Sequence, residues 1–290
     1  MRQKYPLKIL LQISGLCRST YYYNIRKQDK DCKNEVVIKE IHRIFQDHKG
    51  LYGYRRITMT LRNNGYMVNS KKVRRLMKKE GLVSHQRVKW KYSSYKGTVG
   101  TIADNLIHRD FEASRPNEKW FTDITEFNLR GEKCYLSPIL DAYGQEIISS
   151  IVSRTPNLKQ VYDMLNSAFE KNPHVEGLIL HTDQGWQYQH ETYVDRLKEK
   201  GIQQSMSRKG NSMDNGLMEN FFGILKCEMF YGQEDQYSTI EDLMQGIQEY
   251  IDYYNNERGQ ERLGWLTPIE YAKRFKNDYN ETHDAATEAA

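Results

Sequence analysis

After residue 116 the chain passes from strand-like to helix-like patterns in an order that few folds can accommodate. Three segments rich in β-branched and aromatic residues come first, and short turns that contain glycine separate them. Three adjacent strands with short turns predict an antiparallel meander. Helices then alternate with two further apolar or short strand-like segments. The pattern therefore predicts an α/β fold in which helices flank a mixed sheet.

The expected elements follow from these patterns. Strands are predicted over 119–129, 133–144, 145–153, 177–185 and 203–206, and helices from Thr155, over 188–200, over 213–230 and from Ser238. The last of these helices is expected to begin with a capping box that joins Ser238 and Glu241. The polar, alanine-rich residues 277–290 are expected to form a flexible tail.

The first thirty residues predict a partial helix-turn-helix. An apolar segment over 7–13 is followed by a glycine turn and by a second helix, for which Ser19 is the expected N-cap. Arg18 and Ser19 would then lie where a recognition helix meets the edges of DNA bases. The three tyrosines that follow also fit a second interpretation, in which this segment serves packing alone.

Residues 31–82 predict a helical DNA-binding region. Its last helix is expected to begin at Asn69 or Ser70 and to end at Gly81. The apolar positions of this helix point inward, and its other positions are cations: Lys71, Lys72, Arg74, Arg75, Lys78 and Lys79. Six cations on one short helix favour a surface that faces phosphates over one that is merely solvated.

Charge divides the chain into two parts. Residues 1–110 carry 25 Lys and Arg against 8 Asp and Glu, whereas residues 111–290 carry 18 against 30. A basic N-terminal part of this kind is typical of a region that binds a polyanion such as nucleic acid, joined to a domain that concentrates carboxylates. Residues 83–115 are basic and show little periodicity, so they predict a flexible linker before a core that spans 116–276.

Composition excludes several classes of protein. The 38% hydrophobic content is ordinary for a folded globular protein, and no apolar run is long enough to predict a membrane span or a signal peptide. The four cysteines show neither a disulfide framework nor zinc-ligand spacing, so they are expected to be reduced thiols. We therefore expect a cytoplasmic protein without a membrane partner.

Three acids in the core have neighbours that make them candidates for chemistry. Asp123 lies inside the first predicted strand, Asp183 ends the buried strand, and Glu219 lies in the helix over 213–230. Gathering three carboxylates is unfavourable unless a cation lies among them. Because oxygen ligands favour hard ions, Mg²⁺ or Mn²⁺ is the expected metal. On the same helix, Lys226 and Asn215 flank Glu219 where a phosphate backbone would pass.

Asp123, Asp183 after 59 residues and Glu219 after 35 more resemble the DDE motif of retroviral-type integrases and bacterial transposases. The segments WFTDITEF, LILHTDQGWQY, SRKGNSMDNGLMENFFGILKCE and YYNNERGQERLGWLTPIEY look like the integrase core of the insertion sequence three family, specifically its second-frame product. The segments HKGLYGYRRI and VNSKKVRRLMKKEGL are similar to the helical region that precedes this core. The resemblance spans about residues 7–275.

The resemblance implies an RNase H-like fold in which the three acids bind two Mg²⁺ ions, with Mn²⁺ as a substitute. It implies an enzyme that cleaves the ends of an insertion element and joins the resulting 3′-OH to another phosphodiester. It also implies that Lys226 and the loop with Arg208, Lys209 and Asn211 hold the DNA of the element's end.

The expected partners follow from the same resemblance. They are the terminal repeats, target DNA, further copies of the chain bound to DNA, and a product of an upstream frame that supplies the missing helix-turn-helix and zipper. Such an enzyme would be associated with the bacterial nucleoid. Two alternatives remain open from the residues: a catalytically idle DNA-binding relic or modulator of the element, and an RNase H-like nuclease that hydrolyses DNA without joining it.

Overall fold

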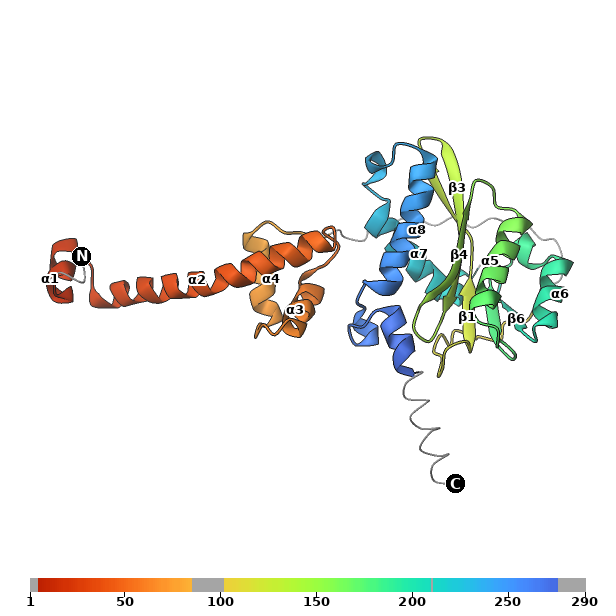
Figure 1. Ribbon diagram of the computed structural model, residues 1–290, viewed down its shortest axis with the longest axis horizontal. Helices are drawn as coiled ribbons and strands as arrows, with labels where there is room; N and C mark the ends of the chain where they lie inside the picture. Colours follow the sequence, from red (N-terminus) through yellow and green to blue (C-terminus); the bar gives the residue numbers. More distant parts are fainter. Residues whose placement is uncertain (1–4, 85–101, 210, 276–290) are drawn as a thin grey trace, which may run out of the picture. The chain divides into compact units, whose positions relative to one another are not determined.

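The computed structural model describes residues 5–84, 102–209 and 211–275, of which residues 24–33 and Ser212 are described by their backbone alone. The chain divides into two compact units, residues 1–85 and 86–290, whose elements Figure 1 shows. Each unit has its own hydrophobic core. The expected tail over 277–290 lies outside the described residues.

The N-terminal unit consists of helices in its described part. They are α1 (Leu7–Ser14), α2 (Arg18–Asp47), α3 (Tyr54–Asn63) and α4 (Ser70–Lys79). Ile41 and Ile44 of α2 pack against Ile57 of α3 and Val73 of α4, and all four side chains are buried. Asn69 caps α4 by accepting a 2.7 Å hydrogen bond from the Lys72 backbone N–H, so Asn69 is the predicted N-cap that the structure confirms.

The start of α2 differs from the prediction. Cys17, not Ser19, is the N-cap, because its Sγ accepts the backbone N–H of Thr20 and the helix already begins at Arg18. The helix then continues without a break to Asp47, and the domain boundary expected at residue 30 lies within it. In the described residues, no helix is both long enough and apolar enough to cross a membrane.

The second unit contains a six-stranded sheet (Figure 1). Its strands are β1 (Lys119–Thr122), β2 (Thr125–Leu129), β3 (Glu132–Asp141), β4 (Ile147–Ser153), β5 (Ile179–Thr182) and β6 (Gln203–Met206). Pairs among β1 to β4 are antiparallel, whereas β5 runs parallel to β1 and β6 runs parallel to β5. The mixed sheet predicted from the sequence is confirmed.

Strands β1 and β2 are two parts of one strand that is interrupted at Asp123. Thr122 pairs with Ile139 and Thr125 with Leu136, so the register against β3 is the same on both sides of the interruption. Asp123 therefore lies opposite Pro138. Because proline has no backbone N–H, it cannot donate a ladder hydrogen bond at this position.

The helices of this unit are α5 (Leu158–Lys171), α6 (Glu191–Glu199), α7 (Gly216–Met229) and α8 (Ile240–Asn256), with short 3₁₀ turns η1 (Trp186–Tyr188), η2 (Ser212–Asn215), η3 (Glu234–Gln236) and η4 (Glu261–Leu263). Helices cover both faces of the sheet. Ser149 of β4 donates to the backbone of α5, whereas its neighbour Ser150 contacts Gln248 of α8. Successive strand residues point to opposite faces.

Two expectations about boundaries need correction. The capping box of α8 joins Thr239 and Asp242, one residue later than predicted, because the Thr239 hydroxyl accepts the Asp242 N–H and the Asp242 carboxylate accepts the Thr239 N–H. The second half of the predicted linker is not a free segment. Residues 102–115 lie against the core, Ile107 is buried, and the Leu106 N–H donates to Ser205 Oγ at 2.9 Å. We call residues 102–110 the strap.

A close approach beside α8 gives the first prediction. A Cβ added at Gly246 would lie 2.6 Å from Cε1 of Tyr237, whose hydroxyl donates to the backbone of Met229. Alanine in a helix interior is ordinarily favoured over glycine by up to about 1 kcal/mol. We nevertheless expect Gly246→Ala to lower the free energy of unfolding by about 1–2 kcal/mol, because the ring must move.

Thermal or urea unfolding of the full chain measures this effect. In the double variant Gly246→Ala/Tyr237→Ala the two destabilising effects should not add, because the ring that causes the clash is absent. A rise in stability for Gly246→Ala alone would contradict the close packing of Tyr237 on α8.

Candidate active site

Asp123 and Asp183 become neighbours through the pairing of β1 with β5. The register joins Lys119 to Ile179 and Phe121 to His181, so its continuation by two residues brings Asp123 opposite Asp183. Adjacent strands of a sheet lie about 4.8 Å apart. Both acids lie at the carboxyl ends of these two parallel strands, which is the edge where open sheets bind ligands.

Local hydrogen bonds orient both carboxylates. Oδ1 of Asp123 accepts the backbone N–H of Ile124 at 2.7 Å, and Oδ1 of Asp183 accepts the backbone N–H of Gly185 at 2.9 Å. A Cβ at Gly185 would lie 3.0 Å from the same Asp183 oxygen and 3.1 Å from Oε1 of Gln187. Glycine at this position therefore permits the close turn after Asp183.

The electrostatic environment couples the three predicted acids. Burial raises the pKa of Asp123 well above its ordinary value, and the nearby charges of Asp183 and Glu219 raise it further, against the effects of the Ile124 N–H and Lys226. Burial also raises the pKa of Asp183, and the hydrogen bond from Gly185 opposes this shift. The fold thus brings together the acids that the sequence analysis selected from three distant segments.

Glu219 and Lys226 are both in α7, but Lys226 is held against the sheet. Its Nζ donates to the backbone carbonyl of Glu126 at 2.8 Å and lies 5.0 Å from the centre of the Phe127 ring. Burial lowers the pKa of Lys226, and the carboxylates of Glu126 and Asp123 oppose that shift. The ammonium group therefore contributes positive charge beside Asp123.

The donor set fits a hard divalent cation. Carboxylate oxygens are the ligands that Mg²⁺ and Mn²⁺ prefer, and the repulsion that raises the pKa of Asp123 is the energy that a cation would relieve. In the described parts of the chain, no group of three or more His, Cys, Asp or Glu side chains is arranged to hold a metal ion. The fit of these residues to the ion rests on their ligand chemistry and charge.

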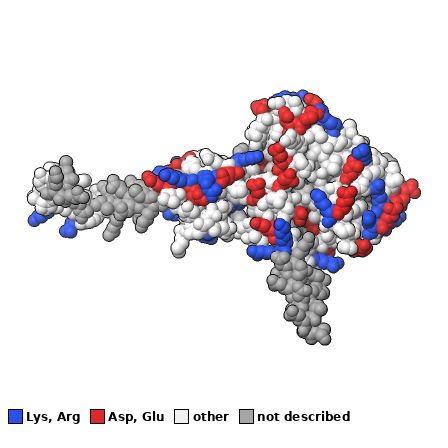
Figure 2. All heavy atoms as spheres, viewed as in Figure 1, with Lys and Arg blue, Asp and Glu red and all other residues white. Residues whose placement is uncertain are grey.

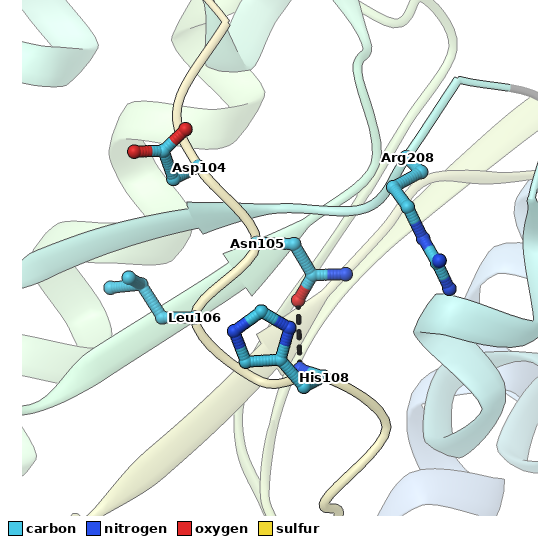
Figure 3. Close-up of a pocket in the computed structure, with 5 residues that line it drawn as sticks. All are labelled: Asp104, Asn105, Leu106, His108 and Arg208. Atoms are coloured by element: carbon cyan, nitrogen blue, oxygen red, sulfur yellow. Dashed lines mark hydrogen bonds between the residues drawn. The ribbon is translucent and has the colours of Figure 1, made fainter.

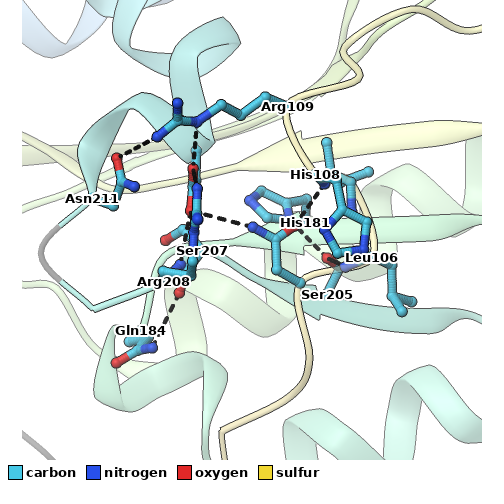
Figure 4. A network of polar contacts seen from close by, with 12 residues as sticks. Leu106, His108, Arg109, His181, Gln184, Ser205, Ser207, Arg208 and Asn211 are labelled. Atoms are coloured by element: carbon cyan, nitrogen blue, oxygen red, sulfur yellow. Dashed lines mark hydrogen bonds and ion pairs between the residues drawn. The ribbon is translucent and has the colours of Figure 1, made fainter.

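Asp214 is a further centre of the site, and the sequence analysis missed it. Its carboxylate is fully buried and accepts two side-chain hydrogen bonds from Arg208, both 2.8 Å, and one from Nε of Arg109 at 2.9 Å (Figure 4). Asn105 of the strap donates to it at 3.2 Å. These hydrogen bonds, those from Arg208 above all, hold the pKa of the Asp214 carboxyl well below its usual range. Its place within SRKGNSMDNG gave no periodic signal.

The predicted DNA-contacting residues around this centre lie in different settings. Arg208 and Lys209 are exposed, and Oδ1 of Asn211 accepts a 3.2 Å hydrogen bond from Arg109. Asn215 is buried, and its Nδ2 donates to the backbone carbonyl of Thr122 at 3.3 Å. Asn215 thus links the start of α7 to β1 beside Asp123.

A second polar contact ties the strap to the sheet. The buried Nδ1 of His181 lies 2.8 Å from Ser205 Oγ, which also accepts the Leu106 N–H (Figure 4). Burial lowers the pKa of His181 to about 4, although the charge of Asp214 opposes this shift. His181 is therefore neutral at pH 7, and it serves packing and hydrogen bonding between β5 and β6.

The strap also borders a pocket of about 580 Å³ (Figure 3). Its lining residues are Asp104, Asn105, Leu106, His108 and Arg208. Figure 3 shows the Arg208 side chain on the opposite side of the pocket from the strap. The pocket thus lies beside the Asp214 cluster.

The predicted cations of the N-terminal unit lie on the side of α4 away from its core. Val73, Leu76 and Met77 are buried, whereas the other face consists of cations, all exposed except the partly buried Lys72: Lys71, Lys72, Arg74, Arg75, Lys78 and Lys79. Arg74 lies 5.5 Å from the centre of the Tyr54 ring. Arg18 and Ser19 are exposed at the start of α2. On the visible face of the second unit, acidic and basic side chains are interspersed (Figure 2).

Comparisons with protein families match most of the described chain. An HTH-like domain matches residues 32–90, and two integrase core domain families match residues 113–212 and 219–275. The first core match includes Asp123 and Asp183, and the second begins at Glu219.

Curated relatives match nearly the whole chain. InsK of insertion sequence element IS150 in Escherichia coli K12, assigned as a transposase, is 48% identical over 93% of this chain and 95% of its own length. The transposase for insertion sequence element IS904 of Lactococcus lactis is 36% identical over 86% of this chain and 98% of its own length. The transposase InsF for insertion sequence IS3A of E. coli is 29% identical over 93% and 95%.

Among solved structures, the catalytic core domain of HTLV-2 integrase in complex with magnesium is 16% identical. It covers 55% of this chain and 98% of that chain, with a TM-score of 0.45.

The hydrogen bonds from Arg109 and Arg208 to Asp214 lead to a prediction about stability and pH. Asp214→Asn removes the charge that two guanidinium groups share, so we expect a loss of about 2 kcal/mol in the free energy of unfolding at pH 7, reduced by the partial exposure of both arginines. Because the folded state lowers the pKa of Asp214, this stabilisation is present above about pH 4, the ordinary aspartate pKa, and is lost as the pH falls further.

The measurement is thermal unfolding of both proteins from pH 7 to pH 3. The difference between their melting temperatures should narrow as the pH falls below about 4, because the unfolded state then takes up a proton that the folded Asp214 still excludes. The control is Asp163→Asn, which removes an exposed carboxylate paired with Lys159 on α5 and should change the melting temperature little. A constant difference across the whole pH range would contradict a depressed pKa for Asp214.

Proposed function

The chain belongs to the insertion sequence three family of transposases, and from this premise we propose that Asp123, Asp183 and Glu219 are the acids with which it cleaves and joins DNA. The protein is a DNA transposase of the DDE type, a polynucleotidyl transferase with an RNase H-like core. What is proposed is the assignment of its residues, metal and DNA contacts.

One observation carries the assignment of the acids. The β1–β5 register brings Asp123 opposite Asp183, and the pKa of Asp123 is raised by burial and then by the charges of Asp183 and Glu219. Carboxylates from three separate segments therefore lie near one another at the carboxyl edge of the sheet. Asp214 and Glu228 of the same unit each have an arginine partner instead: Asp214 pairs with Arg208, and Glu228 pairs with Arg258. Carboxylates that repel one another at a ligand-binding edge are typical of a catalytic site.

The three carboxylates are proposed to hold two Mg²⁺ ions, for which Mn²⁺ can substitute. When bound, the ions would activate the attacking oxygen and stabilise the leaving oxygen of a phosphodiester. In the cleavage step water forms a new P–O bond, the bond to the 3′ oxygen of the element breaks, and that oxygen takes up a proton. In the joining step the same 3′-OH attacks a second phosphodiester, whose own 3′ oxygen leaves.

The residues around the acids are proposed to hold the element's end. Arg208 and Lys209 present exposed cations next to the loop that contains Asn211. Asn215 and Lys226 lie on either side of Glu219 along the chain, and each holds part of the sheet by a hydrogen bond to a backbone carbonyl. These contacts fix the loop and α7 against β1 and β2, so that DNA would meet a rigid surface.

The N-terminal unit is proposed to supply most of the electrostatic grip on DNA. The six cations of α4 and the residues Arg18 and Ser19 at the start of α2 are its candidate contacts. Partners in the proposal are the terminal repeats, target DNA, further copies of the chain on DNA and an upstream-frame product. The catalytically idle alternative has no observation in its favour.

Conservative substitution of the acids tests the catalytic assignment. Asp123→Asn, Asp183→Asn and Glu219→Gln should each reduce cleavage and joining of labelled element-end DNA by at least about a thousandfold, because each removes a charged oxygen ligand. Binding of the same DNA should remain within about twofold, since none of these acids contributes cationic charge. Asp195→Asn, which removes an exposed acid of α6, is the control and should retain activity.

Strand-transfer assays in Mg²⁺ and mobility-shift assays measure the two properties separately. A variant that still joins strands at the wild-type rate would exclude its residue from the catalytic set.

The salt dependence of DNA binding tests the role of α4. Replacing Lys71, Lys72, Arg74 and Arg75 by Ala should weaken binding to all sequences nearly equally, because phosphate contacts carry no sequence information. The slope of log K against log salt should flatten by about 0.9 for each phosphate that the variant no longer neutralises. Lys39→Ala on α2, also an exposed lysine of the same unit, is the control. An unchanged slope in the α4 variant would mean that this face of α4 contacts solvent alone.

A further inference from the structure

Arg109 is a cation that no part of the proposed function uses. It lies in the strap, more than a hundred residues from Asp214 along the chain, yet its Nε donates to Asp214 and its Nη2 donates to Asn211. Arg208, in the loop after β6, donates two hydrogen bonds to the same carboxylate. Arg109, Arg208 and Asp214 form what we call the arginine pair cluster.

The arginine pair cluster has an excess positive charge that faces outward. Two guanidinium groups share one carboxylate, so one unit of positive charge is not neutralised within the cluster. The Asp214 side chain is 0% exposed, whereas the side chains of Arg109 and Arg208 are 42% and 61% exposed. Within the described residues, Nη1 of each arginine makes no hydrogen bond to protein. The unused donors are therefore available to an anion.

Another arginine of the same unit shows the opposite balance. Arg154 has a similar exposure of 44%, but it pairs with two carboxylates, Glu132 and Glu241. That group has an excess negative charge and is a surface ion pair of the ordinary kind. The arginine pair cluster thus differs from Arg154 in net charge and in the burial of its carboxylate.

The backbone holds Arg109 in an unfavourable conformation. His108 and Arg109 have φ angles of 50° and 65°, in the left-handed region that non-glycine residues rarely adopt. Oδ1 of Asn105 accepts the N–H groups of Ile107 and His108, and Nδ2 of Asn105 donates to Asp214. Such strain persists only where surrounding contacts enforce it, and it concentrates at functional sites.

Single hydrogen bonds join the cluster to the chain beside two of the acids. Nε2 of Gln184, next to Asp183, donates to the backbone carbonyl of Ser207, next to Arg208 (Figure 4). Asn215, next to Asp214, donates to the carbonyl of Thr122, which precedes Asp123.

The third acid is joined to the cluster along the chain. Asp214 lies in η2, which leads directly into α7 and Glu219. A DNA strand bound by the arginine pair cluster would therefore have a fixed position relative to all three acids.

We propose that Arg109 and Arg208, organised by Asp214, bind a phosphate of the DNA strand that enters the catalytic site. Guanidinium groups bind phosphate oxygens with two parallel hydrogen bonds, and the buried carboxylate holds both groups in place before DNA arrives. The inference rests on the proposed function, because it identifies a contact for that DNA. It assigns to the strap a direct role in holding substrate.

Phosphate-ethylation interference tests the proposal on the full chain. The probe is a labelled duplex that carries the element's terminal repeat, and all proteins carry Glu219→Gln so that the DNA stays intact. In the reference protein, ethylation of one or two phosphates near the cleaved end should block binding. In Arg109→Gln, interference at these phosphates should weaken, because only Arg208 still contacts them, and binding at 0.15 M salt should weaken about fivefold, as expected for one phosphate contact.

Two further variants make the result specific. Arg109→Lys keeps the positive charge and should retain the salt slope, whereas Arg109→Gln should flatten it by about 0.9. Arg154→Gln removes an equally exposed arginine and should leave both the pattern and the slope unchanged. Melting temperatures of all variants establish that weaker binding does not come from unfolding.

The outcomes separate this proposal from the proposed function. If Arg109→Gln shows the reference interference pattern and slope while folded, the phosphate contact is wrong, although Mg²⁺-dependent joining by the protein with Glu219 intact can still stand. If the pattern depends on Arg109 while the protein with Glu219 intact neither cleaves nor joins DNA, the contact stands and the catalytic assignment is wrong.

Discussion

The parallel pairing of β1 with β5 is the constraint on which the catalytic unit depends. Its register places Asp123 opposite Asp183 at the carboxyl edge of the sheet, and α7 adds Glu219 to the same electrostatic environment. Partly buried carboxylates that repel one another are unfavourable for folding, so the arrangement is hard to explain by stability alone. A cation that binds among them converts this repulsion into binding energy, which is why the arrangement and the chemistry of a DDE transposase belong together.

The hydrogen bonds around Asp214 support the carboxyl edge of the sheet, where Asp123 and Asp183 lie. The buried Asp214 carboxylate joins the strap, the loop after β6 and the start of α7. Each of these segments is also tied to the sheet or its edge by a further hydrogen bond: Leu106 to Ser205, Ser207 to Gln184, and Asn215 to Thr122. Helix α7 is also held at its other end, where Lys226 donates to β2 and the buried pair of Glu228 with Arg258 follows. Glu219 therefore lies on a helix that is anchored at both ends, as its proposed role of metal ligand requires.

In the proposed function the two units have different tasks. The N-terminal unit presents the cations of α4 around a small core, a surface suited to phosphate contacts that do not depend on sequence. The second unit carries the acids, and Arg208 and Lys209 in the loop after β6 and Arg109 in the strap are exposed cations of this unit. Because the proposed DNA contacts lie mainly in one unit and the proposed catalytic acids in the other, substitutions should alter binding and catalysis separately.

The sequence by itself determined the order of strands and helices and the N-cap of α4, and it selected three acids as catalytic candidates, because periodicity, capping residues and motif spacing are local properties that tertiary contacts leave intact. It placed the cap of α2 at Ser19 and the capping box of α8 one residue early, since neighbouring polar residues compete for a cap and packing selects one of them. Only the tertiary structure decided that residues 102–110 pack against the core and that Arg109 meets Asp214. Both residues are charged and lie in aperiodic segments more than a hundred residues apart, so no local pattern could identify their pairing.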